Sequence, residues 1–233
     1  MIVLPIDGIY LLLFCRAIKN VGPCQSDRRY RRIDCSSRNL TAIPEQVLAK
    51  SGLTKLDLSD NNLEDLNGVK SLNRMKDLNL AGNVFDHIGS DVFPCGTRLA
   101  KITGLEVLDF HESGPFSCLE GLKDLDLTLH SDTINETLFE GSNLEVLSLT
   151  LPNAKHLPQK LFGNIAQQIK SIRLSAPNLE SLEHRFSPLM QLRKLYLDLP
   201  KVKVLPKDLL CGDGIEIAHQ LNMSSGALNP LER

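Results

Sequence analysis

The chain has 233 residues and a formal net charge of -2, with 42% hydrophobic and 23% charged residues. This balance is too apolar for a disordered chain, and it lacks the sustained positive surface that nucleic acid as a main ligand requires. The six cysteines are too few and too scattered for a small disulfide scaffold or for paired zinc ligands. A chain of this length is long for one compact core but ordinary for an array of stacked repeats.

The N-terminal segment 1–22 predicts a secretory signal peptide. Residues 9–15 read IYLLLFC, an apolar run of signal length, and the small residues Ala17 and Gly22 follow it. Asp7 interrupts the apolar character and no Lys or Arg precedes the run, so a buried N-terminal strand or short helix stays open as the alternative. No later stretch approaches the roughly 20 apolar residues that span a bilayer, and we expect no membrane span in this chain.

The pattern LxxLxLxxN recurs along the chain, mostly at intervals of 22 to 25 residues. The segment GLTKLDLSDNNLEDL, residues 52–66, matches it almost completely. About seven units result over 53–210, and their leading apolar positions are Leu53, Leu56, Leu58; Met75, Leu78, Leu80; Leu105, Leu108, Phe110; Leu122, Leu125, Leu127; Leu144, Leu147, Leu149; Ile169, Ile172, Leu174; and Leu192, Leu195, Leu197. The one overlong interval precedes Leu105 and predicts an insertion near 94–104.

Each position of the pattern has a structural reason. Alternation of leucine with polar residues predicts one short strand per unit, with the leucines pointing inward. Asn61 and Asn83 suit the following turn, because a side-chain amide can bond backbone groups that a turning chain leaves unpaired. Stacked asparagines of this kind would form a ladder. In later units a proline takes this place and predicts turns of a different build, at Pro152, Pro177 and Pro200.

The return limbs and the segment before the repeats point to a known family. The limbs carry phenylalanine, as at Phe93, Phe162 and Phe186, and IDCSSRNLTAIP at 33–44 looks like the end of a cysteine-bearing cap. These features resemble the extracellular, typical-type leucine-rich-repeat family, and are most similar to Toll-like receptor ectodomains and secreted repeat proteins of that group. The resemblance implies an α/β leucine-rich-repeat solenoid, curved, with a parallel sheet of short strands on its concave face and irregular or short helical return limbs.

The same resemblance divides the chain into parts. The signal peptide at 1–22 is followed by an N-terminal cysteine cap at 23–52 and by the repeats at 53–210. The remainder, 211–233, is interpreted as a degenerate last repeat or a truncated C-terminal cap, since NPLER at its end resembles the opening of such a cap. Both a secreted protein and the ectodomain fragment of a membrane receptor fit this organisation.

The resemblance also gives the cysteines roles. A disulfide between Cys24 and Cys35 would cover the open apolar end of the solenoid and contribute on the order of 3 kcal/mol by loop closure. A second disulfide between Cys95 and Cys118 would bracket the overlong interval, the alternative being two independent buried thiols. Cys211 has no evident partner.

Two further surface features are readable in the sequence. Three N-x-S/T sequons predict glycosylation at Asn39, Asn135 and Asn222 in a secreted chain. Four arginines surround Tyr30 in 28–32 and make the densest basic cluster in the chain. An anionic glycan, a lipid head group and a dibasic processing site would each fit this cluster, and a solvated hairpin is the plain alternative.

Strand positions that point away from the core supply the candidate ligand-binding residues. The early units present an acidic stripe, and the late units a more basic and aromatic end at which Tyr196 could anchor a partner. Exposed strand positions are also polar for solubility alone, which is the competing interpretation. The candidates are Asp57, Asp77, Asp109, His111, Asp124, Asp126, Arg173, Lys194 and Tyr196.

Catalysis is poorly supported by the sequence. The six histidines lie in different repeats, and HExxH, GxSxG and phosphate-loop patterns are absent, so we expect neither a cofactor nor a metal. His111 beside Asp109 and Glu112 lacks a nucleophile and an oxyanion site. We expect a non-enzymatic extracellular binding protein with a protein or glycan ligand on its concave face, and a dimer stays open. The alternatives are a secreted matrix or adhesion spacer and an intracellular scaffolding repeat protein.

Overall fold

The computed structural model describes residues 22–204 except 28, 30, 90–91, 94, 111–113, 183–185 and 187–188, together with the backbone of two short strands nearer the N-terminus. These two strands, β1 (Pro5–Ile6) and β2 (Ile9–Tyr10), pair with each other antiparallel. The predicted signal peptide, Cys211 and Asn222 fall mainly or wholly outside the described residues, as does the segment 211–233. Those predictions remain predictions.

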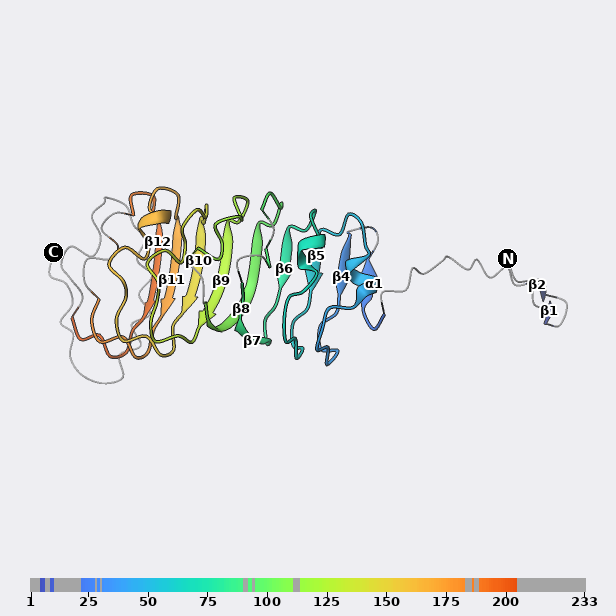
Figure 1. The fold of residues 1–233 in the computed structure, drawn as a ribbon, viewed down its shortest axis with the longest axis horizontal. Helices are drawn as coiled ribbons and strands as arrows, with labels where there is room; N and C mark the ends of the chain where they lie inside the picture. Colours follow the sequence, from blue (N-terminus) through green and yellow to red (C-terminus); the bar gives the residue numbers. More distant parts are fainter. Residues whose placement is uncertain are drawn as a thin grey trace.

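One ten-stranded sheet runs along the molecule, as Figure 1 shows. Its parallel strands follow chain order as β4 (Arg32–Asp34), β5 (Lys55–Asp57), β6 (Asp77–Asn79), β8 (Lys101–Asp109), β9 (Asp124–Leu129), β10 (Val146–Thr150), β11 (Ser171–Ser175) and β12 (Lys194–Asp198). At the cap end β3 (Gln25–Asp27) joins β4 antiparallel, and β7 (Val84–His87) adds a short strand beside β8. The strands from β5 to β12, β7 apart, are the seven predicted repeat strands, so the solenoid is confirmed.

Inward side chains of successive strands stack in register and form the core. Leu56 lies opposite Leu78, and Leu147 lies opposite Leu125 on one side and Ile172 on the other. Each is buried, and a fully buried leucine or isoleucine contributes roughly 1.5–3 kcal/mol relative to an exposed one. The core is therefore a continuous column, in which each repeat closes the apolar side of its neighbour.

The return limbs are mostly turns, as predicted, with a few short helical pieces. These pieces are α1 (Glu45–Leu48), η1 (Val69–Ser71) and η2 (Gly163–Ile165). A column of buried phenylalanines fills the space behind the sheet, and Phe162 stacks with Phe139 at 6.5 Å and with Phe186 at 5.3 Å between ring centroids. The column also contains Phe93 and Phe116.

Asparagine side chains close the early turns, which confirms the predicted ladder. The buried Asn61 amide donates to the carbonyl oxygens of Cys35 and Leu58, and its Oδ1 accepts from two backbone N–H groups of the preceding coil. Asn83 repeats this arrangement one coil further, donating to the Leu58 and Leu80 carbonyls. Each ladder member therefore ties two coils together and satisfies backbone groups that would otherwise be buried unpaired.

The later turns are built differently, as the prolines predict. Asn178 follows a proline and donates from Nδ2 to the Pro152 carbonyl oxygen of the preceding coil at 2.7 Å. Asn153 makes the equivalent bond to the His130 carbonyl, also at 2.7 Å. Both asparagine residues lie nearer the surface than the buried Asn61 and Asn83 do. A single hydrogen bond between coils therefore replaces the set of bonds that each early asparagine makes.

The predicted register of the third repeat is wrong. Ile102, not Leu108, lies opposite Leu78 of β6, and Leu108 is 42% exposed whereas Val107 is fully buried. By residue spacing the second leucine would fall at Gly104, which has φ +64° and where an added Cβ would lie 2.5 Å from the Ala81 Cβ, and the buried Leu105 lies opposite Leu127 instead. A leucine has no room there, so the repeat lacks the pattern by which it would be recognised.

With the observed register, the interval before the third repeat is of ordinary length, so no insertion is needed near 94–104. Once the third repeat begins at Leu99, the leading positions 75, 99 and 122 are 24 and 23 residues apart, which is ordinary spacing. The irregularity lies inside β8 instead, where the pairing with β9 shifts between Ile102 and Leu105. The bulge lets β8 pair with β6 through its first residues and with β7 through its last.

Both predicted disulfides are present. Cys24 bonds to Cys35 with 4.4 Å between their Cα atoms, and this bridge covers the cap end of the core as expected. Cys95 bonds to Cys118 across 23 residues. With no insertion at this point, the second bridge links the return limbs of two successive coils.

Candidate functional site

The polar strand residues that alternate with the buried leucines form one face of the sheet, here called the open face. Along it lie, in chain order, Asp34, Asp57, Asn79, Thr103, Asp126, Ser148, Arg173 and Tyr196, each opposite the next except between Thr103 and Asp126, where the bulge interrupts the pairing. A shallow hollow of about 190 Å³ opens on its early part, between Arg32 and Thr103. This is small for an enclosed ligand, since small-molecule sites measure roughly 300–1,000 Å³.

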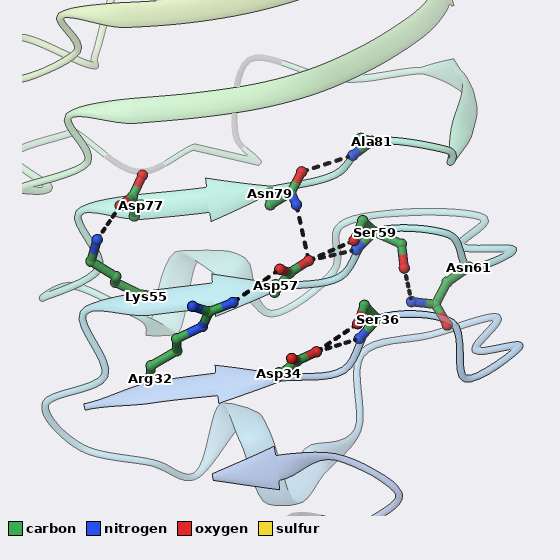
Figure 2. A network of polar contacts seen from close by, with 10 residues as sticks. All are labelled: Arg32, Asp34, Ser36, Lys55, Asp57, Ser59, Asn61, Asp77, Asn79 and Ala81. Carbon is green, nitrogen blue, oxygen red and sulfur yellow. Dashed lines mark hydrogen bonds and ion pairs between the residues drawn. The ribbon is translucent and has the colours of Figure 1, made fainter. Parts of the chain in front are cut away.

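Asp57, a predicted ligand-binding residue, is engaged by the fold itself. Figure 2 shows its carboxylate accepting from the N–H and hydroxyl of Ser59, at 3.2 and 2.7 Å, and from the Asn79 amide at 3.0 Å. Asp34 repeats the contact with Ser36 one coil earlier, and the Ser36 hydroxyl and N–H hold the pKa of that carboxyl below its ordinary value. These aspartates therefore close the turns after β4 and β5.

The predicted acidic stripe is largely neutralised by cations of the neighbouring strands. Lys55 pairs with Asp77 at 2.8 Å, and Lys101 pairs with Asp124 at 2.6 Å. The hydrogen bond that Lys101 donates to Asp124 raises the pKa of Lys101 above its ordinary value, and the charges of nearby carboxylates add to this effect. The sequence pattern aligned the third repeat six residues too late, which left Lys101 ahead of the predicted strand, so its place opposite Asp124 could not be anticipated.

The late end of the open face agrees better with the sequence-based expectation. Arg173 of β11 and Tyr196 of β12 lie opposite each other in register, with the guanidinium carbon 5.1 Å from the centre of the tyrosine ring. Arg173 is exposed, and Lys194 begins the same strand as Tyr196. The three form a cationic and aromatic surface, whereas Asp126 lies further along the face toward the N-terminus.

Asp109 makes no described contact with this surface. Asp109 follows the exposed Leu108 in β8, so strand alternation places it on the same side of the strand as the buried Val107. In the strand register its backbone lies opposite that of His87 in β7. Strand alternation alone thus favours an inward direction for Asp109, and its role in ligand binding stays a prediction. His111 and Glu112 lie outside the described residues, so the proposed constellation around them stays a prediction.

Sequence reasoning missed one polar pair at the far end of β8. Glu106 Oε1 and His130 Nε2 lie 2.7 Å apart and form a hydrogen bond, and both side chains are about one-third exposed. The two residues are 24 positions apart, which is the length of one repeat, and this spacing could have identified them as neighbours. It was hidden because the third repeat was aligned on Leu105.

The described residues offer little that supports other chemistry. Among them no group of three histidine, cysteine or acidic side chains is arranged to hold a metal ion. Within the same residues, no helix is long and apolar enough to cross a membrane. Two of the predicted glycosylation sites, Asn39 and Asn135, are exposed, and both follow the carboxyl ends of strands. Their glycans would leave the opposite edge of the sheet uncovered.

Comparisons with known proteins agree with this fold. No family model matches the chain. Over 177 residues, 73% of the chain, it is 24% identical to human leucine-rich repeats and immunoglobulin-like domains protein 3, of which it covers 15%. Over 72 residues, 30% of the chain, it is 36% identical to leucine-rich repeat-containing G-protein coupled receptor 5A of Xenopus laevis, of which it covers 8%. The chain thus spans a small part of these relatives.

Two solved structures have the same architecture. Internalin C2 of Listeria monocytogenes matches with a TM-score of 0.57 and 17% identity, over 80% of this chain and 79% of that one. Human 5T4, also called trophoblast glycoprotein, matches with a TM-score of 0.54 and 18% identity, over 77% of this chain and 70% of that one. The chain is a leucine-rich-repeat solenoid with a disulfide-linked N-terminal cap.

Proposed function

We propose that this chain is a non-enzymatic extracellular protein that binds a protein ligand on the open face of its sheet. The observation that carries this proposal is the row of polar side chains held at strand spacing over a continuous core, ending in Arg173 and Tyr196. A broad, open and rigid face of this kind suits a protein partner better than a small molecule. Glycan recognition and a role in innate immunity are further expectations of the same kind.

Three observations support the extracellular part of the proposal. The two disulfides fit an oxidising compartment, because cytosolic thiols are kept reduced. Two sequons, at Asn39 and Asn135, are exposed. The relatives include a receptor and a protein with immunoglobulin-like domains, which fits a receptor-ectodomain-like role.

Tyr196 is the residue on which the binding proposal is best tested. We expect Tyr196→Ala to weaken a partner about thirtyfold, since a buried aromatic anchor is worth roughly 2 kcal/mol or more. The partner would first be isolated from cell-surface extracts with the parent protein, and then measured by surface plasmon resonance. The matched control is Met190→Ala, which removes a 74% exposed apolar side chain outside the open face.

The competing interpretation is a matrix or adhesion spacer with no discrete site on this face. That interpretation predicts that Tyr196→Ala, Arg173→Ala and Asp126→Lys each leave the affinity of the isolated partner within about twofold of the parent value. Such a result would move binding away from the open face. A partner that weakened equally with Met190→Ala would also contradict the choice of surface.

A further inference from the structure

A second surface lies along the edge of the sheet at which the strands begin, here called the amino edge. At its cap end, a hollow of about 730 Å³ opens between the β3–β4 hairpin and the segments that lead into β5 and β6. Its lining includes Arg31, Arg32, Lys50 and Arg74, whereas Asp27 is the acidic residue of that lining. Its volume is within the range of sites that hold small ligands.

The guanidinium groups at this hollow are largely left for a ligand. Arg31 and Arg74 are exposed and form no ion pair within the described residues. Arg32 reaches Asp57 at 3.4 Å, with half of its side chain exposed. The hairpin holds Arg31 in the left-handed region, at φ 50°, while its carbonyl oxygen accepts from the Thr54 and Lys55 N–H groups. Backbone hydrogen bonds between the coils therefore fix the position of the Arg31 backbone, from which the side chain extends.

Positive charge continues from the hollow along the amino edge. The residues that precede the strands bond through their backbones from coil to coil, and this row runs Thr54, Lys76, Ala100, Lys123, Glu145, Lys170 and Arg193. Successive members lie one strand spacing apart, about 4.8 Å. Glu145 interrupts the row by pairing with Lys170 at 2.6 Å and Lys123 at 3.1 Å. The cap end, from Arg31 to Lys76, is therefore the more strongly cationic part.

We infer that the hollow at the cap end of the amino edge binds a sulfated, linear polysaccharide. Exposed guanidinium groups form strong, paired hydrogen bonds with sulfate and carboxylate oxygens. Ser51, Ser71 and Asn73 line the same hollow and can bond sugar hydroxyls, and the half-buried Leu48 supplies apolar surface for the C–H face of a ring. The whole chain carries a net charge of -2, so this attraction is local and not a general property of the protein.

The test is the binding of a heparin-derived hexasaccharide by calorimetry. We expect the double variant Arg31→Gln, Arg74→Gln to bind about tenfold more weakly, and its affinity to depend less steeply on salt because fewer counterions are exchanged. The matched control is Lys155→Gln with Lys160→Gln, which removes the same charge from exposed residues of a return limb and should bind as the parent does. The hexasaccharide stripped of its sulfates should not bind.

Several outcomes would overturn the inference. Parent-like binding by the double variant would do so, as would an equal loss in the lysine control. Stronger binding to phosphatidylserine vesicles or to a DNA oligonucleotide of similar charge, with the same dependence on the arginines, would assign the hollow to a membrane or to nucleic acid. If the double variant fails to fold, Arg74→Gln alone carries the test, with an expected loss of about threefold. Tyr196→Ala should leave heparin binding unchanged, which separates this site from the open face.

Discussion

At the scale of single residues, buried polar groups explain why the turns between coils are reproducible. Asn61 is 5% exposed and bonds to the backbone of its own turn and of the preceding coil. Its neighbour Asn62 is exposed, and the bond from its backbone to Leu40 does not involve its side chain. Two adjacent residues of the same type thus have opposite roles, which depend on the direction in which each side chain points.

This contrast gives a direct prediction. Asn61→Ala should destabilise the protein by roughly 3 kcal/mol, because it leaves the Cys35 carbonyl and two N–H groups without their partner and removes one of the two amide donors to the Leu58 carbonyl. Asn62→Ala, the matched control, should change the free energy of unfolding by less than about 0.5 kcal/mol. Denaturant titration followed by circular dichroism measures both. Equal destabilisation by the two changes would show that the ladder is not what stabilises this turn.

At the scale of the element, each strand contributes one side to the core and one to the open face. In β10, Leu147 is 1% exposed and lies between Leu125 and Ile172, whereas Val146 beside it is 41% exposed. The strand is too short to be stable alone, so its position depends on packing against β9 and β11. A change in one inward residue should therefore affect the neighbouring repeats as well.

Leu147→Asp should destabilise the chain by several kcal/mol, since it places an unpaired carboxylate between coils. Hydrogen exchange should show lost protection in β9 and β11 as well as in β10. Val146→Asp introduces the same side chain one residue earlier on the open face, and we expect its melting temperature to stay within a few degrees of the parent value. A Leu147→Asp protein that melts like the parent would mean that the inward positions are wrongly assigned.

At the scale of the whole molecule, the disulfides and the predicted glycosylation sites lie at different places along the solenoid. The bridges Cys24–Cys35 and Cys95–Cys118 secure the cap end and one pair of return limbs. The sequons Asn39 and Asn135 lie beyond the carboxyl ends of β4 and β9, away from the amino edge. Glycans at these two sequons would therefore not lie on the amino edge.

Mass spectrometry of material secreted by cultured cells tests this organisation. We expect no free thiol at the four bridged cysteines, and enzymatic deglycosylation should convert Asn39 and Asn135 to aspartate. Asn153 is exposed but lies in no sequon, and it should stay unmodified as the internal control. Free thiols at Cys24 and Cys35 in secreted protein would contradict the disulfide-linked cap.

The sequence by itself determined the features that repeat locally. The inward leucines and the asparagine ladder depend on spacing within one unit or between adjacent units, and a pattern of 22 to 25 residues records this spacing directly. The cap disulfide was instead predicted from the resemblance of the segment before the repeats to a cysteine-bearing cap. The phenylalanine column was only partly recognised. Phe116 and Phe139 were missed, although Phe93, Phe116, Phe139 and Phe162 are each 23 residues apart, a period that could have identified them.

Only the tertiary structure decided the register of the third repeat and, with it, the composition of the binding surfaces. Gly104 breaks the leucine pattern because Ala81 of the neighbouring coil leaves no room for a side chain, and one sequence position does not show what packs against it. The same holds for Lys101 with Asp124 and for the arginines of the cap-end hollow. These groups come from different coils, and stacking the coils is what brings their charges together.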